Sequence, residues 1–537
     1  MKINIFKTTT IIDRENASKY IHSDEAELPS SIIVIQERAF FGCFDLKNVN
    51  LSECNRLQVI GNYAFCVCNS LKELKFPKGI TKIEGNAFKS CINLEKIDLS
   101  ECEKLEIIGN GAFSECKSLE EIVLPKSISF IGGNVFKDCR NLKKINLSVC
   151  DKLEKIEYGS FSGCESLEEI KIPKNITSIG EKAFGGCVNL VKVDFSECDK
   201  LGKIGNGAFC DCALFKFAFP KSITDIGASA FKGCTYLRKV NLSEYKKLEK
   251  IRASVFSHSD LSAITFPKGI TDIGEKAFEG CKYLKEVNLS EYDKLTIIRN
   301  GAFYGCIGLK EITFPKNLIV IGANAFSGCS SLQIVNLAEY DKLEKIGNGA
   351  FYDCDNLKEI TFPKSITTLG EEFFRGCKKV ETVDLSECTK LEVIGNNAFS
   401  GWDSLKKVIF PKSIISIGKN AFRGCKQLVK TNLSECDKLE KIGDGAFRDC
   451  ESLNDSFLAS YFKRKEEKKI EEKRLKEEKL EAERKLEAER KLKAEEESAK
   501  AAKIGGLILL FMFGGAILYL ICLLYTSPSP RDVEESR

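Results

Sequence analysis

The residues best suited to chemistry in this 537-residue chain are its 25 cysteines, because there are only two histidines. Cysteine thiolates act as nucleophiles, form disulfides and hold metal ions. Catalysis by histidine has little to work with, since His22 and His258 lie far apart in sequence. The chain also has no glycine-rich phosphate loop. We therefore expect a protein that is not an enzyme and that uses no cofactor and no metal.

The cysteines follow a repeat rather than a ligand motif. Sixteen occupy the last position of an A-F-x-x-C segment, and six more follow L-S-E or its variant. Ser259 and Trp402 replace the first kind in two copies, which favours a buried ladder of small apolar side chains over disulfides or metal ligands. The Cys-x-Cys pairs that begin at Cys66 and Cys210 keep the second interpretation open.

The prolines show the length of the repeat. Nine of the 11 prolines, from Pro29 to Pro411, are 47 or 48 residues apart. Each interval holds two copies of I-G-x-x-A-F-x-x-C-x-x-L-x-x-I-x-L, and the shared phenylalanine occurs 18 times, from Phe40 to Phe447. The sequence therefore contains about 18 repeats of alternately about 25 and 23 residues, which is the signature of a solenoid.

Each repeat has the pattern of short strands. In residues 357–362, Ile360 and Phe362 alternate with polar residues, which predicts a half-buried strand. One such strand cannot bury its apolar side alone, but a stack of parallel strands can. The β-branched segment 366–369 predicts a second short strand, and we expect the glycine after it to supply a turn with relaxed φ. The fold class is a mostly β solenoid with turns and short helical segments.

The shared segment resembles the BspA-like leucine-rich repeats, and the resemblance covers about four fifths of the chain. It implies a leucine-rich-repeat solenoid and brings no catalytic residues with it. Proteins of this kind are typically surface antigens and adhesins of bacteria and anaerobic protists. Members in protists such as trichomonads often carry one C-terminal membrane helix.

Solvent-facing strand positions form the candidate binding face, and its expected ligand is a protein or a glycan. The alternative is a solvated face on which stacked charges pair between coils. Lys and Arg total 81 against 77 Asp and Glu, so nucleic acid is not an expected partner. The candidate residues are Lys310, Glu311, Thr313, Lys358, Glu359, Thr361, Lys406 and Lys407.

Composition divides the chain into five segments. Residues 1–24 are an N-terminal cap and 25–457 are the solenoid. Residues 458–503 form a charged stalk, in which pairs such as Glu481–Lys485 and Glu487–Lys491 support a single solvated helix, with self-association as the alternative. Residues 504–525, from Ile504 to Tyr525, carry no charge and are long enough to cross a bilayer. Residues 526–537 resemble translated sequencing-adapter read-through, and we expect the native C-terminus to be missing from about Leu523 onward.

The sequence contains conflicting indications of the side of the membrane on which the solenoid lies. The N-terminus has no apolar core of signal-peptide length, and Lys500 and Lys503 flank the membrane helix on its N-terminal side. These features predict a tail-anchored scaffold that faces the cytoplasm. The family resemblance predicts the cell surface instead. The function we expect is that of a single-pass membrane protein for adhesion or recognition at the cell surface, and the scaffold is the alternative.

Overall fold

The computed structural model describes residues 9–525, and it divides between Asn454 and Asp455 into a solenoid and a helical unit. The first eight residues of the predicted cap and the predicted tail 526–537 lie outside the described residues. The described part of the cap contains the 3-10 helix η2 (Ala17–Tyr20) and strand β2 (Ile21–His22), which pairs antiparallel with β3 (Glu25–Glu27) at the start of the predicted solenoid.

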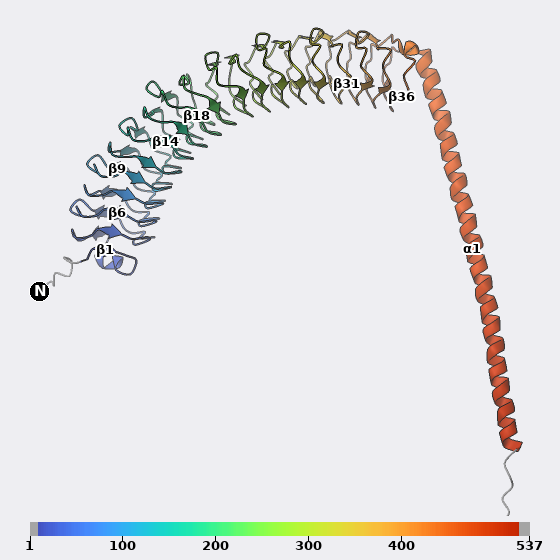
Figure 1. Cartoon of the computed structure of the whole chain (residues 1–537), viewed down its shortest axis with the longest axis horizontal. Coiled ribbons are helices and arrows are strands. Elements are labelled where there is room, and N and C mark those ends of the chain that lie inside the picture. Colours follow the sequence, from blue (N-terminus) through green and yellow to red (C-terminus); the bar gives the residue numbers. More distant parts are fainter. Residues whose placement is uncertain (1–8, 526–537) are drawn as a thin grey trace, which may run out of the picture. The chain divides into compact units, whose positions relative to one another are not determined.

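Each coil of the solenoid contributes strands to two faces, and the coils stack in chain order (Figure 1). The first face consists of two-residue strands that end on the isoleucine of the I-G segment, or on its leucine in one coil. Its strands are β1 (Ile11–Ile12), β4 (Val34–Ile35), β6 (Val59–Ile60), β8 (Lys82–Ile83), β10 (Ile107–Ile108), β12 (Phe130–Ile131), β14 (Lys155–Ile156), β16 (Ser178–Ile179), β18 (Lys203–Ile204), β19 (Asp225–Ile226), β21 (Lys250–Ile251), β23 (Asp272–Ile273), β25 (Ile297–Ile298), β27 (Val320–Ile321), β29 (Lys345–Ile346), β31 (Thr368–Leu369), β33 (Val393–Ile394), β35 (Ser416–Ile417) and β36 (Lys441–Ile442).

The second face consists of the strands that follow the A-F-x-x-C segment, with the short hairpin of the cap at its beginning. Its strands are β2 (Ile21–His22), β3 (Glu25–Glu27), β5 (Asn48–Asn50), β7 (Glu73–Lys75), β9 (Lys96–Asp98), β11 (Glu121–Val123), β13 (Lys144–Ile145), β15 (Glu169–Lys171), β17 (Lys192–Asp194), β20 (Lys239–Asn241), β22 (Ala263–Thr265), β24 (Glu286–Asn288), β26 (Glu311–Thr313), β28 (Ile334–Asn336), β30 (Glu359–Thr361), β32 (Thr382–Asp384) and β34 (Lys407–Ile409).

The register of the parallel strands keeps like side chains above one another. Ile60 pairs with Ile35 on one side and with Ile83 on the other, so the inward isoleucines of the first face form one continuous buried column. On the second face the central residue of each strand points inward and its two neighbours point outward, as in β24. The structure confirms the parallel solenoid and the second strand in each repeat. A further 3-10 helix, η3 (Leu433–Glu435), lies near its C-terminal end.

The shared phenylalanine forms a stack of rings through the solenoid. Successive rings lie face to face, with centroids from 4.8 Å apart for Phe40 and Phe65 to 6.2 Å apart for Phe374 and Phe399. The rings are almost fully buried. Burial of an aromatic ring stabilises the folded state strongly, and ring pairs add about 0.5–1.5 kcal/mol each beyond it. This column therefore binds every coil to the next.

The glycine of the I-G segment has a different role from the one expected. Gly205 and Gly227 do not have a positive φ, so the expectation of a turn with relaxed φ is wrong. A Cβ atom on Gly227 would lie 2.4 Å from the backbone carbonyl carbon of Gly205 in the preceding coil. Glycine is preferred at this position because two backbones pass too close together for a side chain.

Helix α1 (Ser456–Tyr525) is continuous, so the predicted stalk and the predicted membrane segment belong to one helix. The Asp455 carboxylate accepts hydrogen bonds from the backbone N–H groups of Phe457 and Leu458, which caps the first turn. Predicted ion pairs form between Glu481 and Lys485 at 3.0 Å and between Glu487 and Lys491 at 3.1 Å. Its C-terminal part is apolar enough to cross a membrane, with a mean hydropathy of 2.5.

The close approach of backbones at the I-G segment gives a direct test. We expect Gly227→Ala to destabilise the solenoid by about 1–3 kcal/mol, because the added methyl group overpacks a buried backbone contact. Gly202→Ala is the matched control, since its Cβ would meet nothing nearer than 3.7 Å and its φ is not positive. Denaturant unfolding would measure both. Equal effects of the two substitutions would contradict this explanation.

Candidate binding surface

The cysteines of the A-F-x-x-C segment lie in the core beside the phenylalanine stack. All but four of the 25 cysteines are buried. The Cys306 thiol donates a hydrogen bond to the backbone carbonyl of Phe278 in the preceding coil at 3.1 Å. Trp402 replaces a cysteine and donates from Nε1 to the carbonyl of Phe374 at 2.6 Å. Cysteine and tryptophan at this position therefore act as hydrogen-bond donors between coils, whereas the Ser259 hydroxyl donates to the carbonyl of Phe256 in its own coil.

Most cysteines of the second set, which follow L-S-E or its variant, also donate hydrogen bonds to backbone carbonyls of the preceding coil, here at or next to the repeated proline. The Cys198 thiol donates to the carbonyl of Pro173 at 3.5 Å. Tyr245 replaces such a cysteine, and its hydroxyl donates to the carbonyl of Phe219 at 2.7 Å. Within residues 9–525, no group of three or more His, Cys, Asp or Glu side chains is placed to hold a metal ion. The thiols therefore serve the stacking of coils.

Burial changes the acidity of these thiols. It raises the pKa values of Cys102, Cys150 and Cys281 to about 12, because the thiolate loses its hydration in the core. Each folded-state pKa lies above that of a free thiol, so the folded state holds its proton more tightly. The resulting stabilisation is complete below about pH 8.5 and is lost as the pH rises through 12.

Thiol labelling tests this assignment. We expect Cys102, Cys150 and Cys281 to resist an alkylating reagent at pH 8 in the native protein and to react once the protein is unfolded. In the core the reagent cannot reach the sulfur atoms, and the thiols stay protonated and therefore unreactive. The half-buried Cys210 is the internal reference and should be labelled earlier. Mass spectrometry of the labelled peptides would report each site. Rapid native labelling of Cys281 would exclude a buried ladder.

The predicted binding residues all lie on the second face, in or next to β26, β30 and β34. Thr313 and Thr361 are half-buried and donate hydrogen bonds to the side-chain oxygens of Asn288 and Asn336, both at 2.6 Å. These threonines therefore tie each coil to the preceding one. Lys406 forms an ion pair with Glu381 at 2.9 Å, as expected for a face with paired charges.

Several coils of the second face pair their charges with those of the next coil. Opposite charges stand on successive coils, as in Lys96–Glu121 and Lys143–Glu120, both at 3.3 Å, and Lys192–Glu169 at 3.1 Å. Such cross-strand pairs stabilise a sheet modestly. On these coils the arrangement of charge is explained by the stability of the solenoid.

The segment from β24 to β30 departs from this arrangement. Glu286 stands directly opposite Glu311 in the register, and each follows a lysine, Lys285 or Lys310. Within the part of the chain that the structure describes, none of these four exposed side chains has an ion-pair partner. Like charges placed opposite one another destabilise a sheet. Unpaired charges of like sign therefore lie opposite one another between β24 and β26, and the same order of lysine and glutamate returns at Lys358 and Glu359 beyond the uncharged Gln333 and Ile334.

We call this region the charged stripes. The predicted residues Lys310, Glu311, Lys358 and Glu359 belong to it. The prediction missed Lys285 and Glu286, although the repeated L-K-E triplet was the signal that would have included them. Lys407 lies on β34, two strands beyond β30, and Ile334 interrupts the acidic stripe on the strand between β26 and β30.

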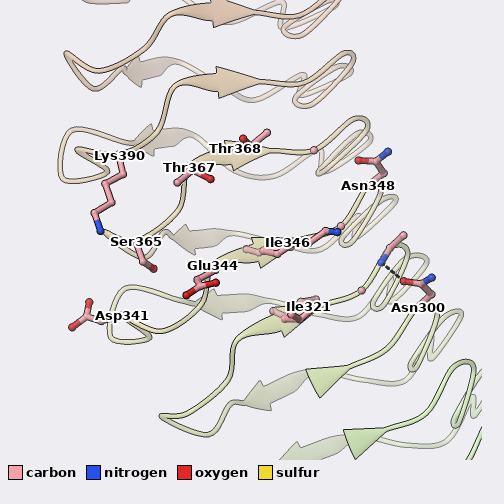
Figure 2. A pocket seen from close by; sticks show the side chains of 16 residues that line it. Asn300, Ile321, Asp341, Glu344, Ile346, Asn348, Ser365, Thr367, Thr368 and Lys390 are labelled. Carbon is pink, nitrogen blue, oxygen red and sulfur yellow. Dashed lines mark hydrogen bonds between the residues drawn. The ribbon is translucent and has the colours of Figure 1, made fainter. Parts of the chain in front are cut away.

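A second candidate surface lies on the first face (Figure 2). A groove of about 980 Å³ runs over β27, β29 and β31, where β29 and β31 are not paired with each other in the described sheets. Figure 2 shows Asp341, Glu344 and Lys390 along one side of the groove and Asn300 and Asn348 on the other. The amide oxygen of Asn300 accepts a hydrogen bond from the backbone N–H of Ala323. Sequence reasoning did not predict this groove, because it arises where two successive coils separate.

Parallel strands on two faces, one phenylalanine per coil and a leucine after the A-F-x-x-C segment, replaced only by Val380, define a leucine-rich-repeat protein. The chain belongs to the BspA type leucine rich repeat region family, whose model matches residues 1–105, 93–213, 202–333, 285–392 and 388–485. This result confirms the family that the sequence resembles.

Solved structures of repeat proteins match the chain at low sequence identity and low TM-score. A leucine-rich repeat protein from Bacteroides ovatus is 22% identical, with 80% of this chain and 83% of that chain covered and a TM-score of 0.38. A leucine rich cell surface protein from Faecalibacterium prausnitzii is 21% identical, with 78% and 83% covered and a TM-score of 0.30. The pneumococcal vaccine antigen PcpA is 19% identical, with 79% and 95% covered and a TM-score of 0.37. No curated protein matches the sequence.

The charged stripes make a prediction about stability. We expect Glu311→Lys to stabilise the solenoid by about 0.2–1 kcal/mol, because it places a lysine opposite Glu286. The matched control is Glu121→Lys, which removes the ion pair with Lys96 and also opposes Lys144, and should destabilise the solenoid. Denaturant unfolding at low salt would compare the two. A loss of stability in Glu311→Lys equal to that of the control would contradict the assignment.

Proposed function

We propose that this chain is a membrane-anchored binding protein of the cell surface that attaches to a protein or glycan through the second face of its solenoid. The charged stripes carry the proposal. Side chains that oppose like charges weaken the fold, so their arrangement is better explained by a ligand than by stability. Membership of a leucine-rich-repeat family supports a binding role, since these folds present long rigid surfaces.

Helix α1 supplies the anchor in this proposal. Its segment from Ile504 to Tyr525 would cross the bilayer, and the charged segment before it would hold the solenoid away from the membrane. Its ion pairs within single turns keep such a helix stable in water without a partner. The two segments form one uninterrupted helix, which suits a stiff spacer.

A second function is favoured by one observation. Lys500 and Lys503 lie immediately before the apolar segment, and basic residues next to a membrane helix favour the cytoplasmic side. In that case the chain would be a tail-anchored scaffold that binds proteins in the cytoplasm. A membrane-impermeant protease added to intact cells separates the two functions. Cleavage of the solenoid supports the surface protein, and protection until the cells are permeabilised supports the scaffold.

Attachment tests the role of the charged stripes. We expect cells that display the full chain to lose most of their attachment to host cells or matrix proteins when Lys310→Glu and Glu311→Lys are combined. This exchange keeps the net charge and reverses both stripes at one coil. The control exchanges Glu95→Lys and Lys96→Glu, on coils where charges pair for stability. Undiminished attachment in the first variant, with normal surface display, would remove the stripes from the binding site.

A further inference from the structure

One coil in the middle of the solenoid has no strand on the second face. Residues 215–219 occupy the place of a strand between β17 and β20, but they form no strand. Phe217 stands where the neighbouring coils carry Val193 and Val240. Its larger ring packs edge-on against two rings of the phenylalanine stack. Its centroid lies 5.2 Å from that of Phe209 and 4.7 Å from that of Phe231. The coil accommodates this ring by leaving the strand geometry, since a filled core has no spare volume.

Exposed apolar side chains gather at the same coils. Phe215 is 60% exposed and Tyr236, on the next coil, is 55% exposed. Val188 and Val191 are 49% and 42% exposed on the preceding coil, and the backbone N–H of Phe215 donates to the carbonyl of Val191 at 3.3 Å. Most outward positions on the second face are charged or polar. Exposed aromatic and apolar side chains on successive coils are typical of binding surfaces.

A shortened turn on each side uncovers Tyr236. Only one residue separates Cys212 from Leu214, and only one separates Ser259 from Leu261, whereas two separate Cys187 from Leu190. Tyr236 occupies the position that these two neighbouring coils lack. No side chain at the equivalent position stands beside its ring on either neighbouring coil, so the ring projects as an anchor.

The surface next to this patch is basic. Lys216 and Lys239 are exposed on successive coils, and neither has an ion-pair partner in the described part of the chain. Both line a groove of about 530 Å³ whose lining includes one carboxylate, Glu244. The charge of Arg238 is already neutralised within the protein. Its guanidinium forms an ion pair with Asp260 at 3.3 Å and lies 4.8 Å from the centre of the Tyr283 ring. The groove therefore offers two free positive charges beside an apolar patch.

We propose that Val188, Val191, Phe215 and Tyr236, together with Lys216 and Lys239, form a docking site for an acidic peptide segment of a protein partner that carries an aromatic or branched aliphatic side chain. The apolar side chain packs on Phe215 and Tyr236, and the carboxylates pair with the two lysines. The aliphatic valines favour a protein over a glycan, because sugars stack on aromatic rings but present many hydroxyl groups. This inference rests on the proposed binding function and assigns the partner's chemistry.

A displayed library of random peptides tests the site. The full chain, held in lipid nanodiscs, is used to select peptides. The selected sequences should be acidic and should contain an aromatic or branched aliphatic residue. We expect their affinity to fall about tenfold or more in Phe215→Ser with Tyr236→Ser, and also in Lys216→Glu with Lys239→Glu, as for anchor residues of an interface. Tyr304→Ser, a change of another exposed aromatic residue that is 46% accessible, is the control and should bind as the wild type does.

Three outcomes would overturn the site. The first is a selection that yields no acidic apolar class, and the second is selected peptides that bind both patch variants normally. The third is sugar binding on a glycan array that the aromatic variant abolishes while no peptides are selected. In each case the attachment assay with the exchanged charged stripes decides the proposed function independently, because that variant leaves this patch intact.

Discussion

The structure depends on the stacking of one phenylalanine ring per coil. Each ring contacts the ring before it and the ring after it, so the spacing of the coils is fixed from the inside of the solenoid. The backbone carbonyl of the same phenylalanine accepts a hydrogen bond from a cysteine thiol of the following coil, or from the indole of Trp402. Close coil spacing in turn requires glycine where backbones pass each other, as at Gly227. The small, buried and polarizable cysteine fits beside the rings and still supplies a donor.

Because the core holds the coils together, the outward residues of the strands are not needed to fix the spacing of the coils. Two solutions appear on the second face. On the N-terminal coils, outward charges alternate in sign and pair, as in Lys192–Glu169, and Thr–Asn hydrogen bonds further along tie successive coils together. Between β24 and β26 the charges repeat instead of alternating and stay unpaired, and the same Lys–Glu order returns at β30 after the uncharged Gln333 and Ile334, which stand just before and at the start of β28. A solenoid stabilised by its interior tolerates this small loss, since repeat stabilities add along the chain.

The interruption at Phe217 shows how a change inside the core alters the surface. A ring in place of a valine fills the core between Phe209 and Phe231, and the strand above it is lost. The same coil has the shortened turn and the exposed Phe215. The irregular coil and its two neighbours therefore combine exposed apolar side chains, a groove and two lysines without an ion pair in the described residues.

The sequence by itself determined the repeat, the two strands in each coil and the family, and it favoured a buried cysteine ladder, because each of these depends on local periodicity repeated many times. It also indicated the outward residues Lys310, Glu311, Lys358 and Glu359, since alternation of side chains along a strand is local. Only the tertiary structure decided which charges pair, because that depends on which residue of the next coil stands opposite. It also decided why Gly227 must be glycine, where β29 and β31 separate into a groove, and where the ring of Phe217 breaks the second face. These features arise from contacts between coils that are far apart in the sequence, and periodicity within one coil does not contain them.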